Sequence, residues 1–287
     1  PAPEPLALWE QVARAAADDA GVPDLLASLD SIQVVYCQTW PYDDPAGRLA
    51  ERLGASPTHK LYSGIGGTVP QVLVSETAEA MQRGELDCAL IVGGEALATK
   101  KALKRAGERP AWSHRENPPS PFPWTPPPAV ELAHEVFQAW ETFPLWDTAR
   151  RARLGIDLAA YDHEMAEVMA AMTPTAAANP HAWSPTALTV EQVQTPGPDN
   201  RYVGWPYTKH EVSVMDVDMA AALLVTTAEK ADALGIPVDK RIYLASSSYA
   251  EDPTGVAERD DMSASAAMRI TSRTALEAAR IGLVDVT

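Results

Sequence analysis

The fold is decided by one stretch of the chain, residues 59–95, which reads HKLYSGIGGTVPQVLVSETAEAMQRGELDCALIVGGE. A strand-like segment leads into a glycine-rich turn at 64–67, and the turn opens a segment whose apolar residues recur with helical spacing. Pro70 suits the first turn of that helix, and Gly84 suits its end. The apolar run 88–92 is typical of a strand covered on both faces. The stretch therefore predicts strand, turn, helix and strand.

The preceding segments show the same alternation of helix and strand. Apolar spacing predicts a helix over residues 5–20, and β-branched and aromatic side chains predict a strand over 32–38. Asp44 is placed to cap a helix over 45–53. This order predicts right-handed crossovers and a mostly parallel α/β sheet, whose ligands usually bind at the carboxyl ends of the strands.

The sheet pattern returns in the last third of the sequence. Residues 219–226 and 241–246 have the composition of strands. Thr226 is expected to begin a capping box for the helix after the first of them, and a serine at 263 or 265 is expected to begin the last helix. These elements predict a second sheet region.

A basic segment and a proline-rich segment interrupt the alternation. Residues 99–109 are expected to form a helix that carries a concentrated group of positive side chains, namely Lys100, Lys101, Lys104, Arg105 and Arg109. It is interpreted either as a solvated helix face or as an approach surface for phosphates. Residues 110–128 hold eight prolines together with Trp112, Phe122 and Trp124, which predicts an extended connector packed by aromatic side chains.

Residues 129–201 show helical patterns and no strand-like run. Two apolar stripes are interpreted as helix core in preference to cofactor contacts. They are Val130, Ala133, Val136, Phe137 and Trp140 in one helix, and Tyr161, Met165, Val168, Met169 and Met172 in another. Residues 110–205 are therefore predicted to form an inserted helical loop domain, which is expected to lie over the glycine turn as a lid or ligand wall.

Composition and charge narrow the classes of function. The chain has 287 residues, 46% of them hydrophobic, and a formal net charge of -16. Phosphate binding needs basic surface, so no nucleic-acid partner is expected, and an anionic ligand would need a local basic or helix-terminus site. Two cysteines in strand-like runs indicate a reducing compartment, and no apolar run is long enough to span a membrane. A soluble cytoplasmic protein is predicted.

Neither a metal nor a redox cofactor is expected. The six histidines and two cysteines show no metal-ligand spacing, and Glu167 stands where a zinc-protease helix beginning at His163 would need its second histidine. Gly64 and Gly66 begin a dinucleotide fingerprint, but Val69 occupies the position of its third glycine. Nicotinamide and flavin are therefore not predicted.

A family resemblance covers nearly the whole chain. GELDCALIVGGEA at 84–96, DMAAALLVTT at 218–227, and AEKA followed by LGIP within 228–237 resemble the thiolase superfamily. NPHAWS at 179–184, and NRY with PYTK within 200–209, resemble a thiolase-like subfamily called acetyl-CoA acetyltransferases, related to sterol-carrier-protein thiolases. The resemblance implies acyltransferase chemistry on coenzyme A thioesters in lipid metabolism.

The resemblance also implies an architecture. A layered α-β-α-β-α fold is expected, with a mostly parallel sheet, an inserted helical loop domain and an incomplete second half. The implied boundaries are an N-terminal α/β domain at 1–109, the loop domain at 110–205 and the start of a C-terminal α/β domain at 206–287. A homodimer through strands near 87–93, or a partner protein that covers the incomplete sheet, is expected. The incomplete second half leaves open that the chain is a fragment.

The sequence departs from the family at the expected site. In a thiolase the turn holds the nucleophilic cysteine, and the matching position here is Gly67, while Cys37 and Cys88 lie in strand-like runs. Backbone N–H groups of the turn can still hold a thioester carbonyl. The predicted substrate-binding residues are Gly66, Gly67, Thr68 and Ser213, and the predicted acid/base residues are His59, Tyr62 and His210.

Three functional hypotheses remain open. The first is a thiolase-like protein that binds acyl-CoA, with lost or different chemistry. A variant of it is a retro-aldolase-type acyl-CoA lyase, which needs an acid and a base but no acyl-enzyme. The third is a non-catalytic partner subunit of a lipid or steroid acyl-CoA degrading complex, suggested by an unfinished sheet whose edge must be covered.

Overall fold

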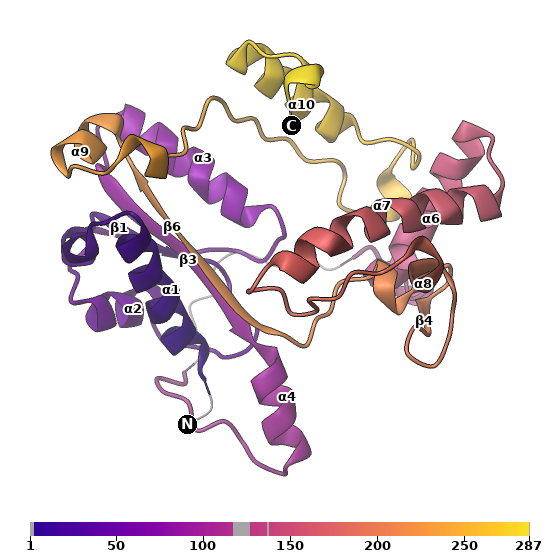
Figure 1. The fold of residues 1–287 in the computed structure, drawn as a ribbon, viewed down its shortest axis with the longest axis horizontal. Helices are drawn as coiled ribbons and strands as arrows, with labels where there is room; N and C mark the ends of the chain where they lie inside the picture. Colours follow the sequence, from indigo (N-terminus) through magenta and orange to yellow (C-terminus); the bar gives the residue numbers. More distant parts are fainter. Residues whose placement is uncertain (1–2, 117–126, 137, 287) are drawn as a thin grey trace. The chain divides into compact units, whose positions relative to one another are not determined.

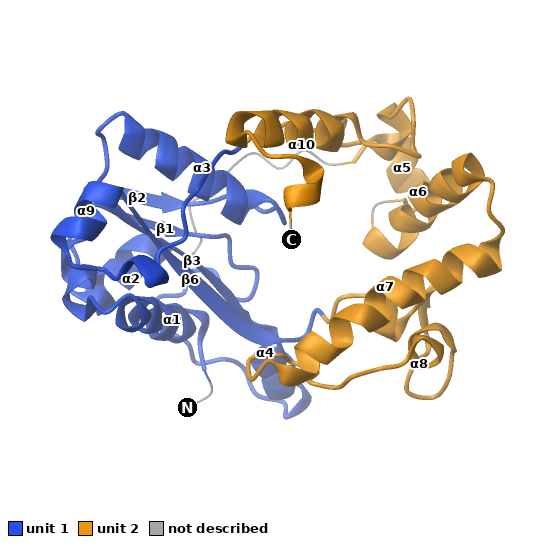
Figure 2. Cartoon of the chain, turned by 45° about the horizontal axis from the view of Figure 1, so that its top comes forward, with its two compact units in different colours: residues 1–124, 215–247 blue, residues 125–214, 248–287 orange. Residues whose placement is uncertain are grey.

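The computed structural model describes residues 3–116, 127–136 and 138–286. The chain divides into two compact units, coloured separately in Figure 2. Unit 1 comprises Pro1–Trp124 and Met215–Ser247, and unit 2 comprises Thr125–Val214 and Ser248–Thr287. Unit 1 thus takes in the first part of the segment predicted to be inserted, residues 110–124, and its second stretch begins after that segment.

Unit 1 is built on a four-stranded mixed sheet (Figure 1). Its strands, in spatial order, are β2 (His59–Tyr62), β1 (Ser31–Val34), β3 (Cys88–Ala96) and β6 (Asp218–Thr226). β1 pairs in parallel with both β2 and β3, whereas β6 runs antiparallel to β3. The predicted α/β class with a mostly parallel sheet is confirmed. The strand at 218–226 completes the same sheet as β3 and does not begin a separate one.

Helices cover both faces of this sheet. They are α1 (Pro5–Asp19), α2 (Pro45–Leu53) and α3 (Val69–Gln82). α4 (Leu97–Arg105) continues from the end of β3 with no buried residue, and the short α9 (Ala228–Ala233) follows β6. Ile32 and Val34 share a buried core with α1 and α2, whereas the Gln33 amide donates to Thr77 Oγ1 of α3 at 2.8 Å. Since successive strand side chains point to opposite faces, α3 lies across the sheet from α1 and α2.

The predicted helix ends are largely confirmed by their capping geometry. The Asp44 side chain accepts from the Gly47 N–H at the start of α2, and Gly54 and Gly84 take positive φ after α2 and α3. The predicted cap at Thr226 is wrong by one residue. Thr227 caps α9, because the Thr226 hydroxyl donates to the Asp87 carbonyl oxygen at 2.7 Å and so remains part of the strand.

A close approach between β3 and β6 requires glycine at position 94. A Cβ atom there would lie 2.5 Å from the Cβ of Ala220 and 2.9 Å from its Cα. The Gly94 carbonyl oxygen also accepts from the indole N–H of Trp9 at 3.1 Å, which ties α1 to β3. Glycine at position 94 is therefore a packing requirement of unit 1.

Unit 2 is mainly helical. Its elements are α5 (Ala129–Ala133), α6 (Ala139–Leu154), α7 (Leu158–Ala178), α8 (Val190–Gln194), the short strands β4 (Tyr202–Gly204) and β5 (Tyr207–Thr208), and α10 (Ala266–Ala279). The hydroxyls of Tyr161 and Tyr207 both donate to the Asp147 carboxylate, which links α6, α7 and β5. Ser265 caps α10, in agreement with the second of its two predicted starts. Short 3-10 turns occupy Lys209–Glu211, Val256–Glu258 and Leu283–Asp285 in unit 2, and Pro23–Ser28 and Val238–Lys240 in unit 1.

The predicted core of unit 2 is partly wrong. Glu135 takes a positive φ of 59° and Gln138 begins a new capping box, so the stripe from Val130 to Trp140 is divided between two helices. Both ends of that stripe are exposed, and Phe137 lies outside the described residues. In α7 the stripe residues Val168 and Met172 are also exposed, because α7 packs on α8 through small side chains, namely Ala166, Ala170 and Val193.

Two other expectations concern irregular segments. The predicted strand 241–246 does not form, because no strand among the described residues pairs with it. Ile242 within this segment is fully exposed. Of the aromatic residues in the proline-rich connector, Trp112 packs edge-on against Trp40 with ring centroids 5.4 Å apart. Phe122 and Trp124 lie outside the described residues.

The substitution Gly94→Ala tests the close approach of the two strands. We expect the free energy of unfolding to fall by about 1–3 kcal/mol, because β6 must move away to admit the methyl group. Urea denaturation followed by tryptophan fluorescence measures this. Gly67→Ala is the matched control, since a Cβ atom at Gly67 meets no atom within 4 Å. Equal stability of the two variants would contradict the packing argument.

Candidate functional site

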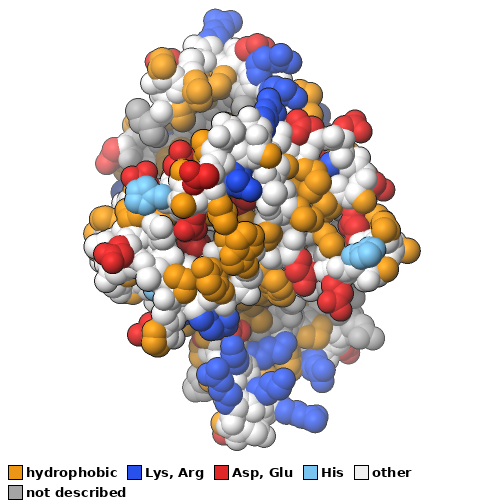
Figure 3. Space-filling model, turned by 90° about the vertical axis from the view of Figure 1, so that its right-hand side faces the viewer, with side chains coloured by type: hydrophobic (Ala, Val, Ile, Leu, Met, Phe, Trp, Pro, Cys, Tyr) orange, Lys and Arg blue, Asp and Glu red, His pale blue; other side chains and the backbone are white. Residues whose placement is uncertain are grey.

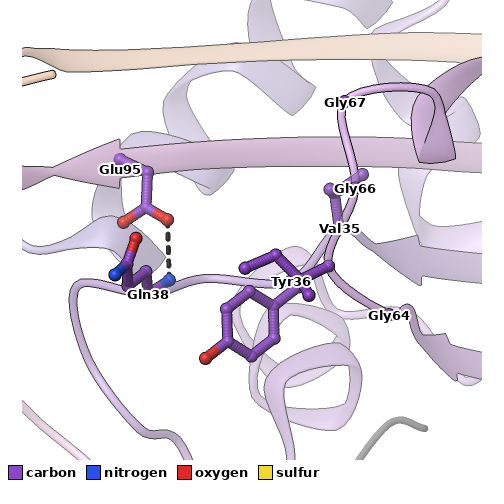
Figure 4. A pocket seen from close by; sticks show the side chains of 8 residues that line it. Val35, Tyr36, Gln38, Gly64, Gly66, Gly67 and Glu95 are labelled. Carbon is purple, nitrogen blue, oxygen red and sulfur yellow. Dashed lines mark hydrogen bonds between the residues drawn. The ribbon is translucent and has the colours of Figure 1, made fainter. Parts of the chain in front are cut away.

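The candidate site lies at the carboxyl edge of the parallel strands. β2 ends at Tyr62, and the chain then passes through the glycine turn to Thr68, the N-cap of α3. The segment after β1 and the last residues of β3 reach the same edge. Together they form an open hollow of about 220 Å³ (Figure 4). It is lined by Val35, Tyr36, Gln38, Gly64, Ile65, Gly66, Gly67 and Glu95.

The glycine turn offers backbone donors to this hollow. Gly67 is exposed, and within the described parts of the chain the N–H groups of Gly67 and Thr68 donate no hydrogen bond. Both lie at the N-terminus of α3, where the helix dipole favours negative charge. Figure 4 shows Gly66 and Gly67 on one side of the hollow and Glu95 with Gln38 on the other. The turn can therefore bind a carbonyl oxygen or an anion.

Glu95 holds the opposite wall in place. Its carboxylate accepts from the N–H of Gln38 at 2.6 Å and from the N–H of Thr39 at 2.8 Å. The Thr39 hydroxyl donates to the same carboxylate and accepts from the N–H of Ala96 at 3.1 Å. Charge-assisted bonds of this kind are about twice as strong as neutral ones. Residues 37–39 are therefore fixed against the end of β3, and we call this set of bonds the Glu95 latch.

Both cysteines are poor nucleophiles in this environment. Burial, followed by the nearby Glu95 carboxylate, raises the pKa of Cys37 to about 12. The Cys37 thiol donates to Glu95 at 3.6 Å as part of the latch. Burial also raises the pKa of Cys88, which lies within β3, to about 11. Since the thiolate is the reactive form, neither side chain supplies a nucleophile near neutral pH.

Two stacked tyrosines lie beside the latch, and one of them, Tyr36, lines the hollow. The Tyr62 hydroxyl accepts from the N–H of Cys37 at 3.0 Å, and its ring stacks on that of Tyr36 with centroids 5.9 Å apart. Burial raises the pKa of Tyr62 to about 12, so it remains protonated at neutral pH. The same hydroxyl donates to the Cys37 carbonyl oxygen at 3.4 Å, so Tyr62 positions the segment after β1.

The structure brings together some of the predicted site residues. Tyr62 joins the three predicted turn residues at one edge of the sheet. His59 begins β2 and so lies at the opposite end of the strand, where its Nδ1 is 2.7 Å from Ser31 Oγ. His210 and Ser213 belong to unit 2. The His210 N–H donates to the Asn200 side chain, and Ser213 is exposed.

Sequence reasoning did not select Glu95, Tyr36 or Gln38. A signal was present for Glu95, because a carboxylate directly after a glycine pair at the end of a buried strand reaches the ligand edge of a parallel sheet. Tyr36 and Gln38 gave no such signal, since they are placed by the latch. Within residues 3–116, 127–136 and 138–286, no group of three or more side chains could hold a metal ion, and no helix is both long and apolar enough to cross a membrane.

Comparison with solved structures places this geometry in a known fold. The chain superposes on a monomeric SCP2-thiolase-like protein type 1 (STLP1) from Mycobacterium smegmatis with a TM-score of 0.81 and 30% sequence identity. The alignment covers 99% of this chain and 56% of that protein, so the chain spans little more than half of its length. The Ltp2-ChsH2(DUF35) aldolase gives a TM-score of 0.69 at 16% identity, covering 99% of this chain and 66% of the other.

These similarities define a thiolase-like α/β fold. No protein-family model matches the chain, and no curated protein sequence is significantly similar to it. The chain is a thiolase-like protein in its fold, and it is similar to the SCP2-thiolase-like group. It carries glycine at the turn position where the family resemblance places the nucleophilic cysteine.

The substitution Glu95→Gln tests the latch. The glutamine amide has one acceptor oxygen in place of the two of the carboxylate. Its NH2 group would face the backbone N–H groups of residues 38 and 39, which are also donors. We expect the free energy of unfolding to fall by about 2–3 kcal/mol and the exchange of these two backbone amides to accelerate. Denaturation and amide hydrogen exchange measure the two effects. Glu76→Gln, on the exposed side of α3, is the control, and an equal response from it would refute the latch.

Proposed function

We propose that the chain binds an acyl-CoA thioester at the hollow between the glycine turn and Glu95. The observation that carries the proposal is the pair of N–H groups at Gly67 and Thr68, which donate no hydrogen bond within the described residues and stand at the N-terminus of a 14-residue helix. Gly67 itself lines the open hollow. Two such donors match the requirement for holding a thioester carbonyl oxygen, which gains negative charge when the thioester reacts. The coenzyme is then a substrate or ligand and not a resident cofactor.

The proposal does not include an acyl-enzyme. Acyl transfer in the thiolase manner needs a thiolate in the turn, where this chain has Gly67. The two thiols of the chain are buried and have raised pKa values, as described above. The acetyltransferase activity implied by the family resemblance is therefore replaced here by thioester binding with lost or different chemistry.

Retro-aldol cleavage of a CoA thioester is the different chemistry that this site fits best. A base removes the proton of a hydroxyl group on the β-carbon of the thioester, and the bond between the α- and β-carbons breaks. The β-carbon leaves as an aldehyde or ketone, and the electron pair forms an enolate whose charge lies on the thioester oxygen until the α-carbon is protonated. The free N–H groups of the turn would hold that oxygen. Glu95 and Tyr36 are the ionisable side chains that line the hollow, and Tyr62, whose ring stacks on Tyr36, stays protonated because burial raises its pKa to about 12. The fold shared with an aldolase complex is compatible with this reaction.

A second candidate function is that of a partner subunit in a lipid or steroid acyl-CoA degrading complex. β6 is an edge strand of the sheet among the described residues, and two of its apolar side chains, Met219 and Leu223, are 48% and 52% exposed. Exposed apolar strand edges are usually covered. The structurally similar Ltp2-ChsH2(DUF35) aldolase is itself named as a complex, which supports a protein partner here.

Titration with acetyl-CoA and with a longer acyl-CoA tests the first proposal. We expect the natural chain to bind both without thioester loss. Gly67→Cys should gain thioester exchange, because a side chain at Gly67 meets no neighbouring atom and its thiolate would be stabilised by α3. Gly67→Ser is the matched control, which keeps the size of the side chain without its thiol. Absence of binding by the natural chain would disprove the proposal.

The partner hypothesis predicts a different result. A tagged chain expressed in its natural host should co-purify with one defined protein at a fixed stoichiometry. The double substitution Met219→Lys and Leu223→Lys should abolish this, because two ammonium groups would have to be buried at the interface. Lys substitutions at the exposed Val168 and Met172 of unit 2 are the control. Recovery of the same partner with both double variants would exclude β6 as the interface.

A further inference from the structure

The basic helix α4 stands out against the charge of the whole chain. The net charge is -16, yet five cationic side chains lie within residues 100–109. α4 buries none of its residues. Lys and Arg side chains gather in the lower part of the face shown in Figure 3, at the level of α4 in Figure 1. This concentration of charge is not needed to pack the helix against the sheet.

Two of the five cations have partners within unit 1. The Lys100 ammonium donates to the Thr39 carbonyl oxygen at 2.6 Å, and Lys101 forms an ion pair with Asp216. The other three, Lys104, Arg105 and Arg109, are exposed and form no hydrogen bond or ion pair within the part of the chain that the structure describes. The helix dipole favours cations in the last turn of a helix, which accounts for Lys104 and Arg105. It does not account for Arg109, which lies beyond the helix end.

The position of α4 connects these free cations to the hollow. Thr39, which binds Lys100, is held by the Glu95 latch, and its neighbour Gln38 lines the hollow. Lys104 is four residues after Lys100 and therefore lies on the same face of the helix. With nine residues, α4 extends for about 13 Å. Lys100 and Lys104 thus form a row of positive charge, and its first member binds the residue next to Gln38, which lines the hollow.

We propose that Lys104, Arg105 and Arg109 bind the phosphate groups of the coenzyme whose thioester occupies the hollow. This inference rests on the proposed function and names the part of the chain that recognises the polyanionic end of the ligand. In coenzyme A an extended pantetheine arm separates the thioester from the phosphates, so the two ends need separate sites. Guanidinium groups suit phosphate oxygens because they donate in a planar fork. On a chain of this net charge, a polyanion is repelled elsewhere.

The experiment compares two ligands on two variants. Acetyl-CoA and acetyl-pantetheine, which carries the thioester but no phosphate, are titrated calorimetrically into the natural chain and into Lys104→Gln/Arg105→Gln/Arg109→Gln. We expect the triple variant to lose about tenfold or more in affinity for acetyl-CoA, and its affinity for acetyl-pantetheine to stay unchanged. Added salt should weaken acetyl-CoA binding in the natural chain more than in the variant.

A control variant separates local contacts from net charge. Arg269→Gln/Arg273→Gln/Arg280→Gln removes three exposed cations from α10 and its end, and it should leave both affinities unchanged. Equal losses from the two triple variants, or an unchanged acetyl-CoA affinity in the α4 variant, would overturn the inference and leave the proposed function standing. If the natural chain binds neither ligand, the proposed function fails and the inference falls with it.

Discussion

The carboxylate of Glu95 is the constraint on which the site depends. It stands at the end of β3 and binds the backbone of the segment that leaves β1, so the ends of two neighbouring strands are fixed to each other. Without it, Gln38 would lose the hydrogen bond that holds its backbone at the hollow. Thr39 extends the same set of bonds to the basic helix α4 through Lys100. One side chain therefore sets the wall of the hollow, and its neighbours set the direction in which α4 leaves the sheet.

The elements of unit 1 were predictable because their signals are local. Alternating segments, Asp44 as a helix cap and glycine at the end of α3 each follow from the preferences of single residues and short windows. The antiparallel direction of β6 was not, because strand direction depends on where the chain returns after a long excursion. Unit 2 was harder still. Large apolar side chains such as Val168 and Met172 suggest a core, yet the helices pack through alanines, and the positive φ of Glu135 has no clear signal in its sequence.

The candidate site was predicted in the same uneven way. The glycine turn was found because a glycine pair between a strand and a helix usually marks a tight turn that a ligand can approach closely. His59 was selected for its nearness in sequence to the turn, but a strand of four residues is long enough to place its first residue at the far edge of the sheet. Glycine at position 67 and the raised pKa values of the two buried cysteines together leave the site without a thiolate near neutral pH.

The pairing of β3 with β6 has a consequence for how unit 1 is made. Ala96 is opposite Asp218 in the register, so the chain leaves the sheet and re-enters it at the same point. Closing so long a loop costs only slightly more than closing one half its length, so the intervening segment can vary in size with little effect on unit 1. The order of events is less tolerant. During synthesis β3 emerges with its edge unpaired, and the sheet is completed only after all of the intervening residues have been added. Until then that apolar edge is open to other chains.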